Sequence, residues 1–463
     1  MITPIKKHIW RLATRLRAFK SQQIPSWARF AHCYFLQAFQ RPIQSATFHK
    51  HLVILAWEFP PVVTAGVYRP ASFARYASEN GWQVSVICGP EPDAPTKAGL
   101  YLSEIIPDAV TVYRVGATPQ WPHPAPLPRI DGGIGNALNV YERASEILEG
   151  LPPGIIFASG PPFHNFVAAT WLAKRYGWQL ALDYRDEWSH NPFQFVMNDR
   201  TNARWEARCL KQADHVVFTT QSQLEHHGRD FPSLLASPTT KNAKGSVIFN
   251  GWEPRDFAAD SANVDTQAFS NKPFTLAFFG NLGPMAHPGE FLDTLSAVYN
   301  QYPELIASTQ VAFVGYKQEA VATQLSNFAY PDNLLLLEQV SKAEAVVMMR
   351  EANALLLLNT PALMRYLQGK LYDYMASETP ILFFGEGGEM ADVIEAQNAG
   401  MVIPYADPNA LALALQGLMT NDLQPAASKK AWLQSRTREH QAQRLLTTLD
   451  TLIEADGSEV KQP

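Results

Sequence analysis

Lys370 and Asp373 are the residues of this sequence whose types and spacing most clearly suit a chemical task. They lie three positions apart just after Gly369, so a helix would place them on one face near its N-terminus. A cation beside free backbone N–H groups suits a phosphate, and a carboxylate suits the hydroxyls of a ribose. The alternative is a Lys–Asp pair on the surface of an ordinary helix.

Gly-rich turns are the second chemical signal. Gly280-Asn281-Leu282-Gly283 follows the apolar segment 274–279 and precedes a helical pattern that begins near Gly289. Small residues after the first strand of a Rossmann unit let backbone N–H groups approach a diphosphate. Ala65-Gly66 is a similar turn in the first half of the chain. Close strand–helix packing is the alternative explanation for both turns.

The elements that must position these residues alternate between apolar strands and helices, which is typical of parallel, doubly wound sheets. The predicted strands cover residues 51–57, 81–88, 110–115, 154–158, 179–184, 215–219, 246–249, 274–279, 309–314, 333–337, 354–358, 381–384 and 401–403. The pattern predicts an α/β fold with two tandem Rossmann-like domains and a ligand cleft between the carboxyl ends of both sheets.

The domain boundaries follow from composition. A polar stretch over residues 253–272 is interpreted as a linker, so the predicted domains are 51–255 and 256–430, after an N-terminal extension over 1–50. Residues 429–454 predict one or two long helices. Leu445, Leu446 and Leu449 would face a core there, and a helix over 430–455 is expected to pack back on the first domain.

Composition limits the class of protein. The chain has 463 residues, 46% of them hydrophobic and 17% charged, which predicts a folded protein of more than one domain. No run of about 18 apolar residues suggests a membrane span. Cys33, Cys88 and Cys209 are too few and too scattered for a disulfide framework or a zinc site, which favours a reducing cytoplasm.

The charge is distributed unevenly. The first acidic residue is Glu58, and nine of the 38 basic residues precede it. Within this leader, residues 4–20 form a helical pattern with one apolar stripe, a flanking Trp10 and basic residues around them. Such a helix is expected to lie on an anionic membrane, and the aromatic segment 27–39 would extend the contact. The alternatives are a helix packed on the protein itself and an organelle transit peptide.

Six motifs occur in a fixed order between residue 51 and about residue 450. They are Phe59-Pro60-Pro61 with Gly66 and Arg69, Ser159 to His164, Asp183 to Trp188, Val247 to Gly251, Gly280 to Gly283, and Lys370 to Pro380. In this order they resemble the glycosyltransferases of the GT-B fold, close to glycosyltransferase family 4 (group 1).

The resemblance implies a nucleotide-sugar donor on the second domain and an acceptor on the first. It puts Asp373, with Lys370 and Leu371 beside it, at the ribose and phosphates, Gly280 to Gly283 against the diphosphate, and the base near Val340 and Ser341. His164 and Asp186 would face the sugar. No metal or other cofactor is expected, because helix N-termini and cationic side chains stabilise the departing diphosphate.

The chain departs from the family in two places. Arg365 stands eight positions before Asp373, where the family usually has a glutamate, and residues 284–293 lack the usual basic pair. Lys370 or Arg365 would then be the phosphate cation. A non-catalytic GT-B binding or scaffold protein is one alternative, which the missing glutamate favours. A nucleotide-sugar epimerase or hydrolase is another.

Several candidate residues have two interpretations each. His164 either contacts the donor sugar or is satisfied locally at a helix start, and Asp186 either accepts a proton from the acceptor hydroxyl or pairs with Arg185. Arg69 either binds a phosphate or faces solvent. Trp188 is expected to pack.

Taken together, the sequence predicts a glycosyltransferase that uses a nucleotide-sugar to extend a glycan or lipid-linked acceptor in cell-surface polysaccharide synthesis, with retention of configuration. It is expected in the cytoplasm, at the inner face of the membrane through residues 4–20. Nucleic-acid binding is not expected, because the body outside the leader is acidic.

Overall fold

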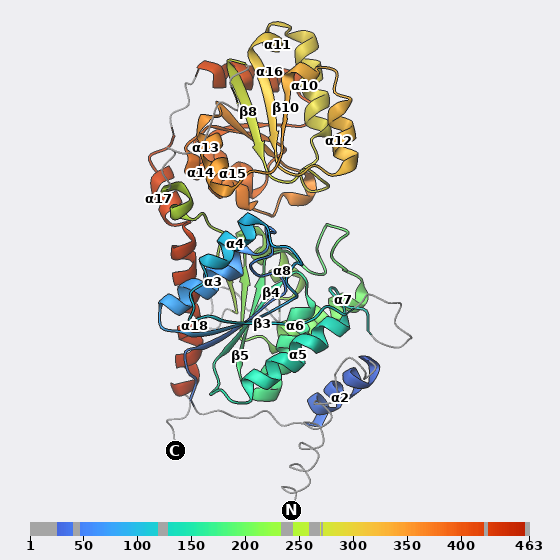
Figure 1. Cartoon of the computed structure of the whole chain (residues 1–463), viewed down its shortest axis with the longest axis vertical. Coiled ribbons are helices and arrows are strands. Elements are labelled where there is room, and N and C mark those ends of the chain that lie inside the picture. Colours follow the sequence, from blue (N-terminus) through green and yellow to red (C-terminus); the bar gives the residue numbers. More distant parts are fainter. Residues whose placement is uncertain are drawn as a thin grey trace, which may run out of the picture.

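A computed structural model describes residues 26–39, 47–118, 128–232, 244–258, 269, 272–420 and 425–458. The predicted amphipathic helix over residues 4–20 lies outside these ranges. Figure 1 shows two α/β bodies, one above the other in the view, with the strands and helices of residues 274–420 in the upper one. The predicted α/β fold with two Rossmann-like domains is confirmed.

The first sheet has seven parallel strands in the order β3-β2-β1-β4-β5-β6-β7. These strands are β1 (His51–Ala56), β2 (Gln83–Cys88), β3 (Thr111–Arg114), β4 (Ile155–Gly160), β5 (Gln179–Tyr184), β6 (His215–Phe218) and β7 (Gly245–Val247). The connecting helices are α3 (Tyr68–Glu79), α4 (Lys97–Glu104), α5 (Ile134–Leu148), α6 (His164–Tyr176), α7 (Arg200–Gln212), α8 (Gln221–Asp230) and α9 (Pro254–Ala258). Every strand predicted for this half is present.

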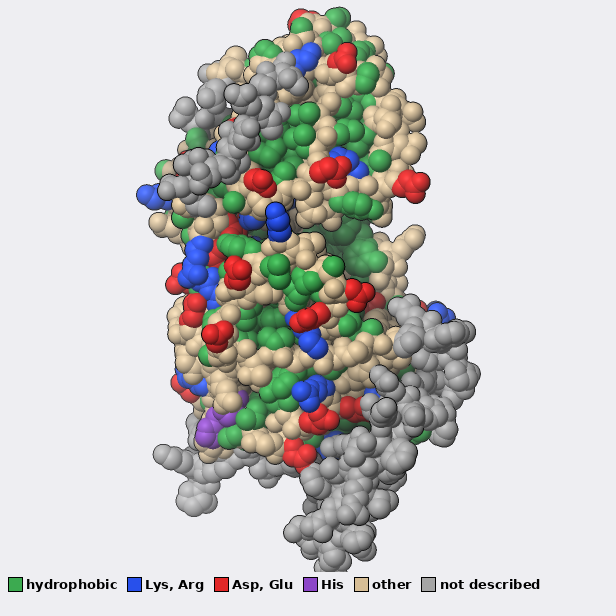
Figure 2. Space-filling view, in the orientation of Figure 1, with side chains coloured by type: hydrophobic (Ala, Val, Ile, Leu, Met, Phe, Trp, Pro, Cys, Tyr) green, Lys and Arg blue, Asp and Glu red, His purple; other side chains and the backbone are tan. Residues whose placement is uncertain are grey.

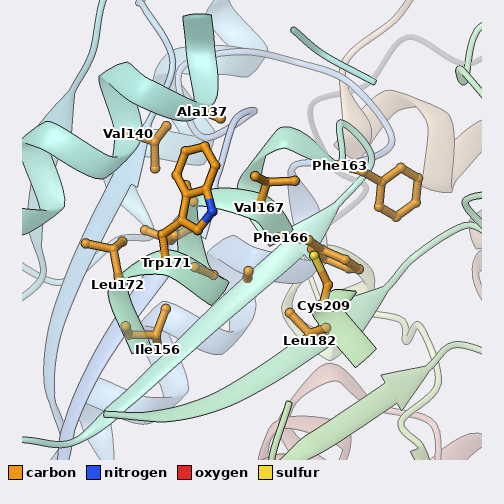
Figure 3. Packing of buried hydrophobic residues seen from close by; sticks show 14 of the residues in the cluster. Ala137, Val140, Ile156, Phe163, Phe166, Val167, Trp171, Leu172, Leu182 and Cys209 are labelled. Carbon is orange, nitrogen blue, oxygen red and sulfur yellow. The ribbon is translucent and has the colours of Figure 1, made fainter. Parts of the chain in front are cut away.

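Alternation along the strands divides the apolar residues of this sheet between its two faces. Val53 and Leu55 of β1 belong to the core under α5, α6 and α7, whereas Leu52 and Ile54 belong to the core under α3. Figure 3 shows the first of these cores, where Trp171 and Phe166 of α6 pack beside side chains of the strands and of α7. Both faces are covered, as expected for a parallel sheet.

The second sheet has six parallel strands in the order β10-β9-β8-β11-β12-β13. They are β8 (Phe274–Phe279), β9 (Thr309–Val314), β10 (Leu334–Leu337), β11 (Ala354–Leu358), β12 (Ile381–Phe384) and β13 (Gly400–Ile403). The helices around it are α10 (Gly289–Gln301), α11 (Glu304–Ser308), α12 (Glu319–Ser326), α13 (Lys342–Glu351), α14 (Gly369–Ser377), α15 (Gly388–Ala396) and α16 (Pro408–Thr420). The strands β8 and β11 lie at the centre, so the residues that follow them meet at one edge.

The chain finishes on the first domain. Helices α17 (Lys429–Gln434) and α18 (Arg438–Ser458) follow the second sheet, and α18 packs against α3. Leu445, Leu446 and Leu449 are buried in the same core as α3. Figure 1 shows α18 running along the side of the lower body. The two domains are therefore joined both by the chain after β7 and by these last helices.

The aromatic segment of the leader forms a helix, α2 (Ser26–Phe39), that packs on this protein. Arg29 forms an ion pair with Glu142 of α5 at 2.8 Å, and Cys33 is buried in the first core. The segment thus packs on α5 and α6 of the protein itself, and a membrane contact through this helix stays a prediction. Of the helices in the described ranges, none is long and apolar enough to cross a membrane.

Candidate functional site

A cleft of about 1250 Å³ lies between the carboxyl ends of the two sheets. Figure 2 shows the corresponding hollow between the upper and the lower body. Both domains line the cleft, and so do Arg438 and Gln441 of α18. The predicted site residues that line it are Gly66, Arg69, Arg185, Asp186, Gly280, Asn281, Leu282, Gly283, Lys370 and Asp373. This volume is large enough for two small ligands at once.

Two glycines shape the wall formed by the C-terminal domain. Gly280 follows β8 with a φ of 126°, and Gly315 follows β9 with a φ of 132°, conformations that favour glycine. A Cβ atom on Gly315 would lie 2.4 Å from the carbonyl oxygen of Gly280. The two loops can therefore meet only without side chains at these points. Their meeting leaves the backbone of Gly280 exposed to the cleft.

Lys370 lies beside this turn, on the first turn of α14. Its Nζ is 3.8 Å from the centre of the Phe278 ring, and a Cβ on Gly280 would lie 3.2 Å from it. Burial lowers the pKa of Lys370 to about 7. Lys370 forms no ion pair with a carboxylate among the described residues. An anion placed next to the Gly280 turn would find this ammonium group available.

Asp373 lies one turn further along α14 and contacts the start of α13. Its Oδ2 forms an ion pair with Lys342 Nζ at 2.5 Å. Its Oδ1 is buried and has no hydrogen-bond partner within the described part of the chain. Burying an acceptor without a partner is costly, so this oxygen is a natural place for the hydroxyl of a ligand.

Three predicted donor contacts do not line the cleft. Leu371 is fully buried in the core beneath the second sheet. Ser341 is the N-cap of α13, where its Oγ accepts a hydrogen bond from Glu344 N–H at 3.2 Å, and Val340 packs against the same core as Leu371. Their neighbour Gln339 lines the cleft instead.

The N-terminal domain contributes a Gly66 loop that is closed by Arg185. A Cβ on Gly66 would lie 1.8 Å from Arg185 Nη1, so a larger residue there would push the Arg185 guanidinium aside. The guanidinium donates a hydrogen bond to the Pro161 carbonyl and lies 3.9 Å from the Glu58 carboxylate. Arg185 therefore links three loops of the first sheet, and it does not pair with Asp186.

Arg69 is held differently from either prediction. Its guanidinium donates three hydrogen bonds to Asp183, at 2.7, 3.0 and 3.1 Å, and one to the Phe249 carbonyl at 3.0 Å. Only 6% of the residue is exposed, although part of it lines the cleft. The arginine neutralises a fully buried aspartate, so the structure uses it to hold β5 against the loop after β7.

Asp186 follows β5 and lies half-buried in the wall of the cleft. Burial raises its pKa to about 6, the nearby Arg185 charge opposes this rise, and Glu187 and Glu58 add to it. No hydrogen bond or ion pair holds its carboxylate among the described residues. This is a carboxylate that faces the cleft and exchanges its proton close to neutral pH, as a general base does.

His164, the other predicted catalytic residue, lies behind the cleft wall. It is fully buried, with its ring 4.7 Å from that of Trp57 in an edge-on contact. Neither ring nitrogen has a hydrogen-bond partner in the part of the chain that the structure describes, and burial lowers the pKa of His164 to about 3. A Cβ on Gly132 would lie 2.1 Å from His164 Nδ1, so the loop at Gly132 separates the ring from the cleft.

Arg365 joins the two domains and does not line the cleft. It donates hydrogen bonds to both carboxylate oxygens of the fully buried Glu187, at 2.5 and 3.0 Å, and Tyr366 adds a third at 3.1 Å. Nearby, Glu389 of α15 accepts the backbone N–H groups of Gln221 and Ser222 at the start of α8. Arg365, one of the two predicted phosphate cations, is thus held in an ion pair between the domains.

Sequence reasoning missed two charged partners at this site. Lys342 was not singled out, although Ser341 and Glu344 form a capping box that marks α13 as starting at Lys342. Glu187 stood inside the quoted motif Asp183 to Trp188 without a role. Trp188 packs as predicted, fully buried with its ring stacked 4.8 Å from Phe163.

Comparison with known families matches both halves of the chain. Residues 65–233 match the family described as glycosyl transferase 4-like domain, and residues 273–421 match glycosyl transferases group 1. Together the two matches cover about two-thirds of the chain. None of the curated protein sequences matches it.

Solved structures with the same two-domain architecture cover most of the chain. Sucrose-phosphate synthase from Thermosynechococcus elongatus matches with a TM-score of 0.61 and 16% identity, over 88% of this chain and 100% of its own. Alr3699/HepE from Anabaena, in complex with UDP and glucose, has a TM-score of 0.61 and 14% identity over 87% and 100%. The lipopolysaccharide outer core galactosyltransferase WaaB has a TM-score of 0.58 and 12% identity over 87% and 99%. With the two family matches, this likeness in fold shows that the chain is a GT-B glycosyltransferase and belongs to group 1.

Proposed function

We propose that this enzyme transfers a sugar from a nucleotide-sugar to an acceptor hydroxyl, with the donor on the C-terminal wall of the cleft. The observation that carries the proposal is that two charged side chains on α14 keep binding capacity that the fold does not use. Within the described ranges, Lys370 has no carboxylate partner and lies beside the Gly280 turn, and one carboxylate oxygen of Asp373 has no partner. A diphosphate and a ribose satisfy these two groups at the spacing of one helical turn.

The chemistry of transfer explains why a cation is needed there. As the bond between the sugar and the diphosphate breaks, the sugar becomes oxocarbenium-like and the diphosphate gains negative charge. Lys370, which binds a proton more tightly once an anion is next to it, stabilises that charge together with the N-terminus of α14. The proposed reaction needs no resident cofactor or metal ion.

The acceptor belongs on the opposite wall in this proposal. Asp186 faces the cleft with a raised pKa of about 6, so above that pH its carboxylate accepts a proton from an acceptor hydroxyl. No carboxylate in the described cleft wall is assigned as a nucleophile. Family membership favours retention of the anomeric configuration, and we include retention in the proposal.

The acceptor class is proposed as a glycan or lipid-linked saccharide for the cell surface. One similar fold carries the name of a lipopolysaccharide galactosyltransferase, and another is in complex with UDP and glucose. The apolar stripe and surrounding basic residues of positions 4–20 fit an anionic membrane surface, which would keep the enzyme in the cytoplasm at the inner face of the membrane.

The first test is donor binding. The purified full chain is heated with each member of a panel of uridine, guanosine and thymidine diphosphate sugars, alongside Asp373→Ala. One donor is expected to raise the melting temperature of the wild type, and the shift should disappear in the variant. The exposed Asp293→Ala on α10 is the matched control and should keep the full shift.

The same panel separates the alternatives. A well-folded wild type that no donor stabilises would reject the donor site. Stabilisation without transfer to any offered glycan would identify a binding protein, in line with the replacement of the family's glutamate by Arg365. Release of free sugar or of an epimer without an acceptor would identify a hydrolase or an epimerase.

A further inference from the structure

Outside the cleft, two histidines and an aspartate converge at the end of α8. They are His190, from the loop after β5, and His226 and Asp230, from α8 itself. We propose that these three side chains form a binding site for a divalent transition metal ion, with Zn²⁺ as the best match to the donor set. The proposal does not depend on sugar transfer, because none of the three residues lines the cleft.

The geometry suits a compact ion. One ligand atom from each residue lies within 4.8 Å of the ligand atoms of the other two. His190 Nε2 and Asp230 Oδ2 are 3.1 Å apart, close to the separation of about 3.4 Å between two ligands on a tetrahedral zinc ion. His226 and Asp230 are four residues apart, so α8 presents both on one face. The site therefore needs only small side-chain adjustments to close on a metal.

A second observation fixes the role of His226. Its Nδ1 lies 2.9 Å from Glu187 Oε1, so its Nε2 is the nitrogen left for a metal. A histidine held by a carboxylate through one nitrogen while it ligates through the other is the usual arrangement around protein-bound zinc. Glu187 thus orients the ligand. The position of Asp230 at the C-terminal end of α8 also favours a cation there.

A deeper group, formed by Glu187, His226 and His227, does not suit a metal. Glu187 already accepts hydrogen bonds from Arg365 and Tyr366, and His227 is fully buried with its Nδ1 3.1 Å from the Gln223 carbonyl. A metal there would compete with a guanidinium for the same carboxylate. The outer group is open to solvent, with 30% of the His190 side chain and 44% of that of Asp230 exposed.

The donor set narrows the choice of metal. Two imidazoles and one carboxylate suit zinc and its late first-row neighbours, and exclude Ca²⁺ and Mg²⁺ as preferred ions because those take oxygen ligands. With three protein ligands, a fourth position stays open to water. Two residues, His226 and Glu187, would connect the metal to Arg365 of the C-terminal domain.

The test uses the tag-free full chain after chelator treatment. Co²⁺ is titrated while the visible absorbance of tetrahedral cobalt is followed, and Zn²⁺ is then added as a competitor. The wild type is expected to bind one equivalent of Co²⁺, which Zn²⁺ displaces. His190→Ala and Asp230→Asn should each weaken binding at least about tenfold, since each removes a ligand. His440→Ala, an exposed histidine on α18, is the control and should bind as the wild type does.

Two results would overturn the proposal. One is a wild type that gives no cobalt spectrum up to millimolar metal. The other is tight binding that survives unchanged in either ligand variant, which would place the metal elsewhere. The two variants lie on different segments, so a folding failure of one, seen by circular dichroism, leaves the other as the test.

Discussion

Arg69 and Lys370 are both cations in the wall of the same cleft, yet their surroundings are opposite. Arg69 of the N-terminal domain is surrounded by acceptors, with three hydrogen bonds to Asp183 and one to a carbonyl. Lys370 of the C-terminal domain faces the ring of Phe278 and has no carboxylate partner in the described ranges. Arg69 therefore neutralises a carboxylate of the protein itself, whereas the charge of Lys370 is left to interact with a bound ligand.

The difference shows how to recognise a binding residue from its surroundings. A buried arginine that is hydrogen-bonded to a buried carboxylate contributes to folding, because removing it leaves that carboxylate buried without its counter-charge. A lysine whose pKa is lowered to about 7 by burial costs the fold stability in its charged form. Such a cost persists where function requires it, so Lys370 is a stronger candidate for anion binding than Arg69 or Arg365.

Replacing Lys370 by Met is expected to have the largest effect on binding. Donor affinity should fall by about 100-fold or more, since the cation beside the diphosphate is lost. In the wild type, a bound diphosphate raises the pKa of Lys370, so binding at pH 8 to 9 should take up a proton. Titration calorimetry in buffers of different ionisation enthalpy measures both quantities.

The free energy of unfolding of Lys370→Met should change in the opposite direction to its donor affinity. Because the pKa of Lys370 in the fold is about 7, below its ordinary 10.5, the unfolded chain binds more protons between these values. Wild-type stability should therefore rise with pH across this window, and the variant should be more stable than the wild type at pH 7 and below. Lys429→Met, at a buried lysine outside the cleft, should keep normal donor affinity. Unchanged donor binding by Lys370→Met would remove the basis of the comparison.

Arg69→Met should have the reverse pattern of Lys370→Met, with lower stability and unchanged donor affinity. It should lower the free energy of unfolding by about 3 kcal/mol, because Asp183 stays buried with Ser159 Oγ as its remaining side-chain partner. Donor affinity of the folded variant should stay close to that of the wild type. Urea denaturation measures the first quantity and calorimetry the second. A stable variant that has lost donor binding would assign Arg69 to the ligand and not to the fold.

Arg365→Ala tests the ion pair that joins the domains. A loss of about 2 kcal/mol is expected, less than for Arg69 because 31% of the Arg365 side chain is exposed. Arg365→Glu, which restores the family's residue, should be worse than alanine since it faces Glu187, and Glu187→Gln should relieve part of that loss. Arg143→Ala, in an exposed pair with Glu146, is the control and should change stability by less than about 0.5 kcal/mol. Denaturation of all single and double variants measures the coupling.

These examples show which parts of the molecule the sequence could predict. Each predicted strand is present because a buried parallel strand is a local apolar run, and the turn after β8 follows from glycines next to such a run. The partners of the charges are not local. Asp183 is 114 residues from Arg69 and Glu187 is 178 residues from Arg365, so no spacing rule pairs them. His164 was a candidate catalytic residue because of its residue type, but its burial depends on the distant loop at Gly132.

Asp186 is the exception in the N-terminal domain, a cleft carboxylate that no ion pair or hydrogen bond holds among the described residues. Its pKa of about 6 lies above the ordinary 3.8, so the fold binds more protons than the unfolded chain between these values and loses stability as the pH rises through them. Asp186→Asn should therefore be more stable than the wild type by about 1 kcal/mol at pH 8, with no difference near pH 4. Urea denaturation at both pH values measures this.

The same variant also tests the role of Asp186 in transfer. A wild-type base that works ionised should make kcat/KM rise with pH through about 6, and this rise should be absent in the residual activity of Asp186→Asn. A variant that is less stable than the wild type at pH 8 would mean that Asp186 is a structural charge like Arg69. A variant that is more stable and nearly inactive would place Asp186 with Lys370, as a buried charge that lowers the stability of the fold but is needed for the reaction.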